Sequence, residues 1–358
     1  MMNTAPEPIK DYYIAYMDVL GYKQFFIENP DKAPEFLAYI HDAIQKTKEH
    51  LNITKISPIL STYANMDIKI KVFSDNILIC MSFEEHDPAD QLRLLCFVKL
   101  ISEIQRGFIT QFGLFLRGGL TKGKLSFHDE YVFGQGLIDA VAMEESAKYP
   151  RIIVDEALIS YMTEVRVYKQ NDIEKAAVIA QKMTENEIIT EDEKQFYMQF
   201  NYNVFMHNYQ VQEMNQLVSC WRDGYYYLCY LYYVKADDPR HKDLLDHALP
   251  GFKDAFPVDY EIVMSRQIGL AEMMKAHKER VESNLKRYGN YNDCTTGQDV
   301  KQRENVMQKY IWSMAYHNLA CTANGTPEYS ILTKANFDAR FVKPTIEVIT
   351  GDQSSQKQ

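Results

Sequence analysis

The sequence predicts an α+β fold, and three patterns support that prediction. Residues 12–20 read YYIAYMDVL, an apolar run rich in β-forming residues that is typical of a central strand covered on both faces. Residues 67–73 and 77–83 are two further strand-like runs, joined by a short polar connection of hairpin type. Residues 34–51 and 88–112 instead carry an apolar residue at every third or fourth position, which indicates amphipathic helices.

The order of these elements narrows the fold class. Gly21 ends the first strand, and a strand at 114–120 follows the second helix. The order strand, helix, hairpin, helix, strand is the βαββαβ pattern of ferredoxin-like domains. Further short strands are expected at 131–133 and 151–154. In such a sheet the hairpin runs antiparallel beside the first strand, so the hairpin turn is expected next to the carboxyl end of that strand.

The second half of the chain is predicted to be mainly helical. A charged, Gln-rich stretch at about 166–216 indicates a helical insertion, and residues 218–234 indicate a β-hairpin that turns at Asp223-Gly224. Two long periodic segments, parted by a loop of Asn, Gly and Thr, predict a helical hairpin. The expected helices span 176–183, 191–200, 259–288 and 300–321. The expected organisation is a domain at 1–235, a helical extension at 236–325 and a polar tail at 326–358.

Charge and cysteine usage restrict the partners and the compartment. The 358 residues carry 39 Lys and Arg against 49 Asp and Glu, and the basic residues are scattered. A nucleic-acid polymer is therefore not expected as a partner, whereas a nucleotide needs only a local group of cations and metal ions. The six cysteines form no C-x-x-C pair, which favours buried thiols in a reducing compartment. No secretory signal and no apolar run long enough to span a membrane is evident, so the cytoplasm is the expected location.

Two aspartates are the strongest candidates for a site. Asp18 lies near the end of the first strand and Asp75 in the turn of the hairpin, so the predicted topology brings them together. Two close carboxylates repel each other, an arrangement that favours hard cations between them. Two Mg²⁺ or Mn²⁺ ions there would bind a triphosphate and lower the pKa of an attacking ribose hydroxyl. From spacing alone, each aspartate is also open to interpretation as a cap or turn residue.

Several motifs follow one another along the first half of the chain. Residues 18–22 read DVLGY, an Asp followed by an aliphatic pair, Gly and an aromatic residue. This pattern resembles the first metal motif of class III nucleotidyl cyclases. Residues 71–75 (KVFSD) are similar to the second, which has a Lys four residues before the second metal Asp. Residues 117–123 (RGGLTKG) resemble the strand and glycine turn that follow, and 133–144 with 149–154 resemble the closing helix and strand. The resemblance covers roughly 12–161.

Within that family, four stretches are similar to the bacterial pyrimidine cyclases of Pycsar antiphage systems, which make cyclic UMP or cyclic CMP. The resemblance implies conversion of UTP or CTP to a 3′,5′-cyclic nucleotide and pyrophosphate. It also implies a messenger for a separate effector, and a symmetric homodimer with two sites at its interface. Asp18, Asp75 and the backbone carbonyl of Val19 would hold two metal ions. The similar stretches are Arg117 to Gly119, Phe133 to Gly136, Glu144, and Tyr149 to Ile152.

The chain departs from the family pattern at positions that read the base and stabilise charge. Tyr131 stands where purine cyclases carry an acidic residue, which favours a pyrimidine. The positions of their Asn and transition-state Arg fall near Ile138 or Asp139 and at Ala142, so the usual cation is absent. Phosphoryl transfer still needs cations near the developing charge. The candidates are Arg117, Lys122, Lys148 and Arg151.

The base pocket is assigned to Lys71, Phe73 and Tyr131, and nucleotide binding also to Lys122 and Gly134. Plain core packing for Phe73, and a solvated strand charge for Lys71, stay open as other interpretations. Two other classes of protein compete with a cyclase. One is a catalytically degenerate cyclase-like module that binds a nucleotide or serves as a scaffold, and the absent Arg supports it. The other is a palm-domain polymerase, which would need a basic groove that the sequence lacks.

Overall fold

The computed structural model describes residues 8–53, 67–84, 90–128, 130–163, 169–200, 217–221, 223–232, 269–289 and 295–331. An eight-stranded, mostly antiparallel sheet forms its centre, with strand order β2-β3-β1-β4-β6-β8-β7 and with β5 paired to β4. The strands are β1 (Lys10–Leu20), β2 (Ile68–Phe73), β3 (Asn76–Ser82), β4 (Phe115–Phe127), β5 (Val132–Phe133), β6 (Ile152–Val154), β7 (Val218–Cys220) and β8 (Tyr226–Leu228).

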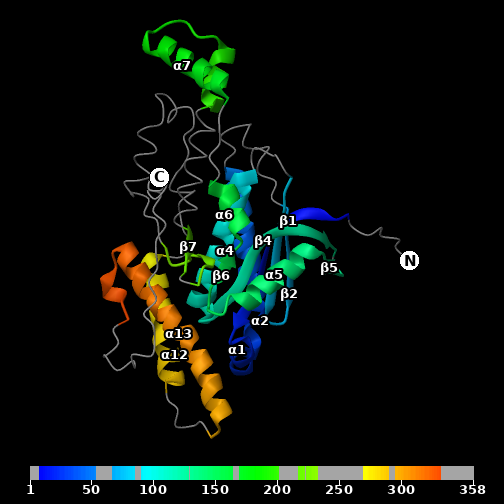
Figure 1. The fold of residues 1–358 in the computed structure, drawn as a ribbon, viewed down its shortest axis with the longest axis vertical. Coiled ribbons are helices and arrows are strands. Elements are labelled where there is room, and N and C mark those ends of the chain that lie inside the picture. Colours follow the sequence, from blue (N-terminus) through cyan, green and yellow to red (C-terminus); the bar gives the residue numbers. More distant parts are fainter. Residues whose placement is uncertain are drawn as a thin grey trace, which may run out of the picture.

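Helices accompany this sheet along the whole described chain, so the predicted α+β class is confirmed (Figure 1). The α-helices are α1 (Tyr22–Glu28), α2 (Ala33–Ile53), α4 (Asp90–Phe112), α5 (Gln135–Ser146), α6 (Glu156–Thr163), α7 (Gln170–Thr184), α12 (Leu270–Tyr288) and α13 (Gly297–Asn324). Two short 3-10 helices span Pro30–Lys32 and Pro327–Tyr329. The sequence patterns predicted neither α1 nor α6.

Strand β1 is the central strand that its apolar sequence predicts. It pairs antiparallel with β3 on one side and with β4 on the other. Its residues from Tyr12 to Ala15 are fully buried because both faces are covered. Gly21 ends the strand with a φ of 85°, a left-handed conformation that glycine adopts without steric cost.

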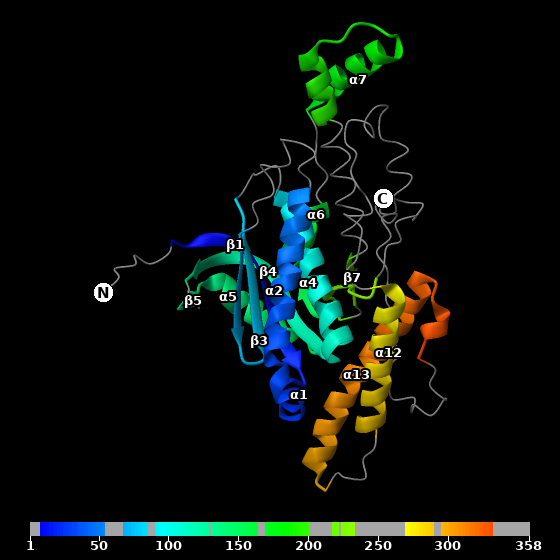
Figure 2. The ribbon, with the colours of Figure 1, turned by 180° about the vertical axis from the view of Figure 1, so that it is seen from behind.

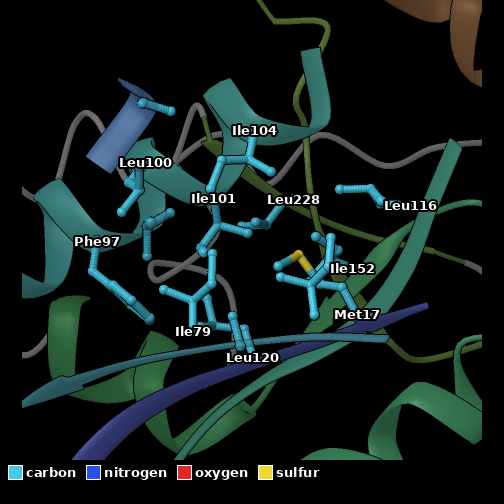
Figure 3. Close-up of a cluster of buried hydrophobic side chains, with 14 of the residues drawn as sticks. Met17, Ile79, Phe97, Leu100, Ile101, Ile104, Leu116, Leu120, Ile152 and Leu228 are labelled. Carbon is cyan, nitrogen blue, oxygen red and sulfur yellow. The ribbon is translucent and has the colours of Figure 1, made fainter. Parts of the chain in front are cut away.

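Different helices pack against the two faces of the sheet. On one face, α2 and α4 pack over β1, β3 and β4 to form the largest apolar cluster, part of which Figure 3 shows around Met17, Ile101 and Leu120. On the opposite face, α5 packs over β4 and β1, and Ile14 with Ala140 belongs to a second apolar cluster there. Helices therefore flank the sheet on both sides (Figures 1 and 2).

Strand β4 differs from the prediction. It runs for 13 residues, well past the expected end at 120, and no turn interrupts it at the glycines of the 117–123 motif. The glycines serve helix packing instead. A Cβ on Gly119 would lie 2.4 Å from the Cβ of Met143 in α5, and one on Gly123 would lie 2.6 Å from the Cα of Gly136. The predicted glycine turn is therefore wrong, and close approach of α5 is what these positions need.

The predicted hairpin is present as β7 and β8, and it extends the sheet, although both strands are shorter than expected. Helices α12 and α13 run side by side (Figures 1 and 2) and, with β8 and part of α4, enclose a third apolar cluster. Thr296 begins α13 with a capping box shared with Asp299. The predictions for 201–216, 233–268 and 332–358 lie outside the described residues.

The region predicted to be a helical insertion begins, among the described residues, with α7. Residues 191–200 form a second helix, and the two share a small apolar cluster of Ala176, Ile179 and Tyr197. The expected helix at 176–183 lies within α7, which starts six residues earlier, at Gln170. In Figure 1 this pair lies apart from the sheet.

Candidate functional site

One row of side chains crosses four strands near the end of β1. Phe73 pairs with Asn76, Asn76 with Asp18, and Asp18 with Arg117. We call these four residues the Asp18 row. Directly opposed residues in antiparallel strands point to the same face, so this row lies on the face that carries α5. The hairpin turn thus lies beside the carboxyl end of β1, as the order of elements predicts.

Arg117 joins two carboxylates in this row. Its Nη2 lies 3.0 Å from Oδ2 of Asp18 and 2.5 Å from Oε1 of Glu144. The side chains of Arg117 and Asp18 keep 22% and 19% of their surface exposed, so a ligand in solvent can reach them. Glu144 is more deeply buried, since it belongs to the inward stripe of α5 with Gly136 and Ala140.

Burial governs the protonation of both carboxyl groups. It raises the pKa of Asp18, the Arg117 guanidinium opposes this shift, and the nearby Asp75 adds to it. Burial likewise raises the pKa of Glu144, with Arg117 opposing and Asp18 adding. Burial also raises the pKa of Tyr16, and the negative charges of Glu144 and Asp18 add to this shift. Tyr16 lies two residues before Asp18, on the same face of β1. One guanidinium therefore neutralises this acidic group incompletely.

Asp75 is held by the backbone of the turn. Its carbonyl oxygen accepts a hydrogen bond of 2.8 Å from the N–H of Val19. The Nδ2 of Asn76 donates to Oδ1 of Asp75 at 3.2 Å. Ser74 adopts a φ of 58°, which is uncommon for a residue with a side chain and reflects the tight two-residue turn. The turn therefore fixes the backbone of Asp75 against β1.

The donor atoms here suit a hard cation. Asp18, Asp75 and the carbonyl of Val19 offer only oxygen, and the repulsion between the two carboxylates favours a cation near them. Within the described residues, no group of three or more His, Cys, Asp or Glu side chains is placed to hold a metal ion. Mg²⁺ commonly binds through one or two carboxylates together with substrate phosphates. The pair of aspartates therefore fits an ion that arrives with a phosphate ligand.

A lysine of α13 also belongs to this environment. Burial lowers the pKa of Lys309, and the Arg117 guanidinium lowers it further, while Asp18 and Glu144 act in the opposite direction. Lys309 is half-buried. The helical extension thus brings a cation toward the carboxylates of the sheet.

Arg151, a candidate cation from the sequence, lies in a different setting. It has no exposed surface, and its Nη1 and Nη2 atoms donate to the two carboxylate oxygens of Asp223 at 3.2 Å and 2.5 Å. Its Nε donates to the carbonyl of Ala147 at 3.0 Å. The guanidinium also lies 5.2–6.0 Å from the ring centroids of Tyr149, Tyr225, Tyr227 and Trp312. We call this group the Arg151 clasp, and every donor of its guanidinium faces protein.

The residues assigned to the base pocket lie on the α5 face of the sheet. Phe73 is 52% exposed, which excludes plain core packing within this chain. Lys71 is half-buried, and its Nζ lies 5.9 Å from the ring centroid of Phe127. Phe73 belongs to the Asp18 row, and Lys71 lies two residues before it on β2.

Other predicted residues lie away from that row. Lys122 pairs with Tyr13 and lies 5.7 Å from the ring of Tyr161, so it belongs to the opposite face of the sheet. Lys148 is exposed after the end of α5. Gly134 begins α5 with a φ of 143°, and a Cβ there would lie 2.3 Å from the carbonyl oxygen of Lys124.

Tyr131 lies at the far end of the ladder formed by β1 and β4. Its ring stacks on His128 at 4.7 Å, and β5, which follows it, pairs with Ser126 of β4. Arg117 and Ser126 are nine residues apart on β4, a path of about 30 Å along the strand. Within one chain, Tyr131 therefore lies beyond the opposite end of this ladder from Asp18.

Sequence reasoning gave Glu144 no role in the site and missed Lys309 entirely. A signal for Glu144 was present, because Gly136, Ala140 and Glu144 follow one another at a spacing of four, which places the carboxylate on the buried stripe of a helix. Lys309 has no such local signal, since its proximity to Asp18 depends on how α13 packs.

No family model matches this chain, and no curated protein matches it. Among the described residues, no helix is long and apolar enough to cross a membrane. Function is therefore inferred from the chemistry of the Asp18 row.

Proposed function

We propose that this chain is a metal-dependent nucleotidyl cyclase that closes a pyrimidine nucleoside triphosphate into its 3′,5′-cyclic nucleotide. The observation that carries the proposal is the position of Asp75 beside Asp18, with burial and the nearby Asp75 both raising the pKa of Asp18. Two carboxylates placed in this way favour cations and the phosphates they carry.

The topology of the sheet supports the proposal. Strands β2, β3, β1 and β4 are neighbours in that order, and each adjacent pair is antiparallel. Helices α1 and α2 connect β1 to the hairpin, and α4 connects the hairpin to β4. This connectivity is compatible with the βαββαβ pattern, in which the first strand and the hairpin turn meet.

In the proposed reaction, the ribose 3′-oxygen forms a bond to the α-phosphorus. The bond from that phosphorus to the oxygen leading to the β-phosphate breaks, and its electron pair leaves with pyrophosphate, while the hydroxyl proton passes to solvent. Asp18, Asp75 and the Val19 carbonyl would hold Mg²⁺ or Mn²⁺, which would lower the pKa of the hydroxyl and offset phosphate charge. Arg117 holds Asp18 in place through its 3.0 Å contact.

The homodimer with shared sites is proposed from the resemblance to class III cyclases. Tyr131 lies beyond the opposite end of the β1 and β4 ladder from the Asp18 row, whereas Lys71 lies near the row of its own chain. The positions of the missing family residues, Ile138, Asp139 and Ala142, are exposed on the outer side of α5. In that proposal, a second copy related by a two-fold axis contributes its Tyr131 and Lys71 to the row of the first, as the resemblance implies.

We assign Arg151 a structural role, because the Arg151 clasp leaves its guanidinium no surface for substrate. The preference for UTP or CTP rests on Tyr131 and on the resemblance to Pycsar cyclases. A messenger role in antiphage defence, with a separate effector, rests on that resemblance alone.

The proposal is tested by incubating the purified protein with each of the four ribonucleoside triphosphates and Mn²⁺, and by identifying products by mass. Cyclic UMP or cyclic CMP with pyrophosphate is expected. Asp18→Asn and Asp75→Asn should each lower turnover at least about 1,000-fold, because each removes charge from the metal site. Turnover near the wild-type rate in either variant would contradict the metal assignment. If cyclic AMP or cyclic GMP is the main product, the proposed cyclase activity stands and the proposed preference for pyrimidines is wrong.

Sharing of sites is tested by mixing two inactive variants, Asp75→Asn and Lys71→Ala, under conditions that allow subunits to exchange. A mixed dimer contains one site with both functional halves, so part of the activity should return. If exchange is demonstrated and no activity returns, each site is built within one chain. Binding of a nucleotide without any turnover in the wild type would instead favour the degenerate binding module.

A further inference from the structure

Helix α13 lies beside the end of the sheet that carries the Asp18 row. The ring of Tyr310 lies 6.0 Å from that of Phe115, and Phe115 pairs with Leu20 at the end of β1. Leu20 and Met143, the residue before Glu144, both pack against the apolar cluster that holds Met307 and Ile311 of α13. Helix α13 therefore packs both against the end of β1 that carries Asp18 and against the part of α5 that carries Glu144.

Lys309 immediately precedes Tyr310, so this packing fixes the position of its backbone. Its side chain is half-buried, and the charges that act on it are those of Arg117, Asp18 and Glu144. In the described part of the chain, no ion pair within 4.0 Å involves Lys309. A lysine ammonium on a four-carbon stem is a mobile point charge, which suits contact with phosphate oxygens.

Arg117 alone does not satisfy all the polar groups of the Asp18 row and Glu144. Arg117 already lies close to two carboxylates through one nitrogen, Nη2. Within the described residues, Nε of Arg117 is buried and has no hydrogen-bond partner, although Nη2 of the same guanidinium lies 2.5 Å from Oε1 of Glu144. A buried donor without a partner indicates a site that is not fully satisfied by the chain itself.

We propose that Lys309 is the cation of this site that contacts the triphosphate of the substrate, so that the C-terminal helical pair completes the site. This inference rests on the proposed function. Negative charge grows on the departing pyrophosphate as the bond to the α-phosphorus breaks, and an ammonium hydrogen-bonded to a pyrophosphate oxygen stabilises that charge. The helix α13 thus supplies the charge that no residue of α5 provides.

The experiment compares Lys309→Met, which keeps the aliphatic stem, with Lys309→Arg, which keeps the charge, and with Lys301→Met as a control. Lys301 is exposed on the same helix, eight residues earlier. Two readouts are used: kcat/KM for cyclic nucleotide formation, and equilibrium binding of inorganic tripolyphosphate in the presence of Mn²⁺. Melting temperatures confirm that each variant folds.

We expect Lys309→Met to lower kcat/KM by about 100- to 1,000-fold and to weaken tripolyphosphate binding about tenfold. Lys309→Arg should restore part of both, and Lys301→Met should change neither. Unchanged binding and turnover in Lys309→Met, or an equal loss in Lys301→Met, would overturn the inference. If the wild type binds tripolyphosphate through Lys309 but forms no cyclic product, the inference stands and the proposed reaction fails. If the wild type does neither, both fail.

Discussion

Two arginines of neighbouring strand segments occupy opposite kinds of environment. Arg151 is wholly buried, with both terminal nitrogens on Asp223 and four aromatic rings around its guanidinium. Arg117 keeps part of its surface exposed, and one of its nitrogens is shared between two carboxylates. The two arginines differ in how many of their hydrogen-bond donors already contact protein groups. A cation whose donors all face protein cannot bind a substrate, whereas a cation with an unbonded donor can.

The largest effect on stability is expected from breaking the Arg151 clasp. Arg151→Met should lower the free energy of unfolding by about 3–5 kcal/mol, because it leaves Asp223 without its cation and empties the space between the rings. The lower end applies, since Asp223 is 31% exposed. Denaturant unfolding measures the loss, and turnover per folded molecule should change little. A loss below about 1 kcal/mol, or a specific loss of turnover, would place Arg151 with the functional cations.

A smaller effect is expected where α5 approaches β4. Gly119→Ala would bring a Cβ within 2.4 Å of Met143, so α5 must move and carry Glu144 away from Arg117. Overpacking of this kind costs about 1–3 kcal/mol of unfolding free energy, and turnover should fall as well. Gly297→Ala is the matched control, because nothing lies within 4 Å of its Cβ position. Equal stability of the two variants would contradict the close packing.

The smallest effect is expected at Glu144, and its sign is opposite. Because its pKa is raised, the folded protein keeps this proton to a higher pH than the unfolded chain does. The contribution of Glu144 to the free energy of unfolding therefore falls as pH rises from the ordinary carboxyl range through the raised pKa, and it stays low above that pH. Glu144→Gln removes the cost of the buried charge.

We therefore expect Glu144→Gln to raise the free energy of unfolding at pH 7 by less than about 1 kcal/mol, while turnover declines. The gain should shrink as pH falls toward the ordinary range of a carboxyl group. Thermal unfolding followed across this pH range measures both trends. If the variant is less stable than the wild type at pH 7, then the pair with Arg117, rather than burial, dominates at Glu144.

Local pattern predicted the parts of the fold that depend on neighbours in sequence. The apolar run of β1 and the polar turn at Asp75 were enough to predict a central strand beside a hairpin, and the register of Asp18 with Asn76 agrees. The glycines of β4 were misread as a turn, because a glycine is required both by turns and by close helix packing. Only the position of α5 distinguishes the two causes.

The roles of the two arginines were not predictable from sequence. Asp223 lies 72 residues after Arg151, and no local spacing indicates that they meet. Glu144 and Arg117 meet because α5 crosses β4, which depends on tertiary packing. Lys309 lies farther still, on a helix whose position follows from the burial of Met307, Ile311 and Trp312.

The distance along the chain between Asp18 and Lys309 has a consequence for the timing of synthesis. The two residues are 291 positions apart (309 − 18), so the ribosome makes the first long before the second. At about 5–20 residues per second, the interval is roughly 15–60 s. During that interval, a nascent chain can already contain the sheet and both aspartates yet lack the lysine of α13. If the proposed cyclase reaction and the role of Lys309 both hold, a partly made chain forms cyclic nucleotide far more slowly than the whole chain, until α13 has emerged and packed.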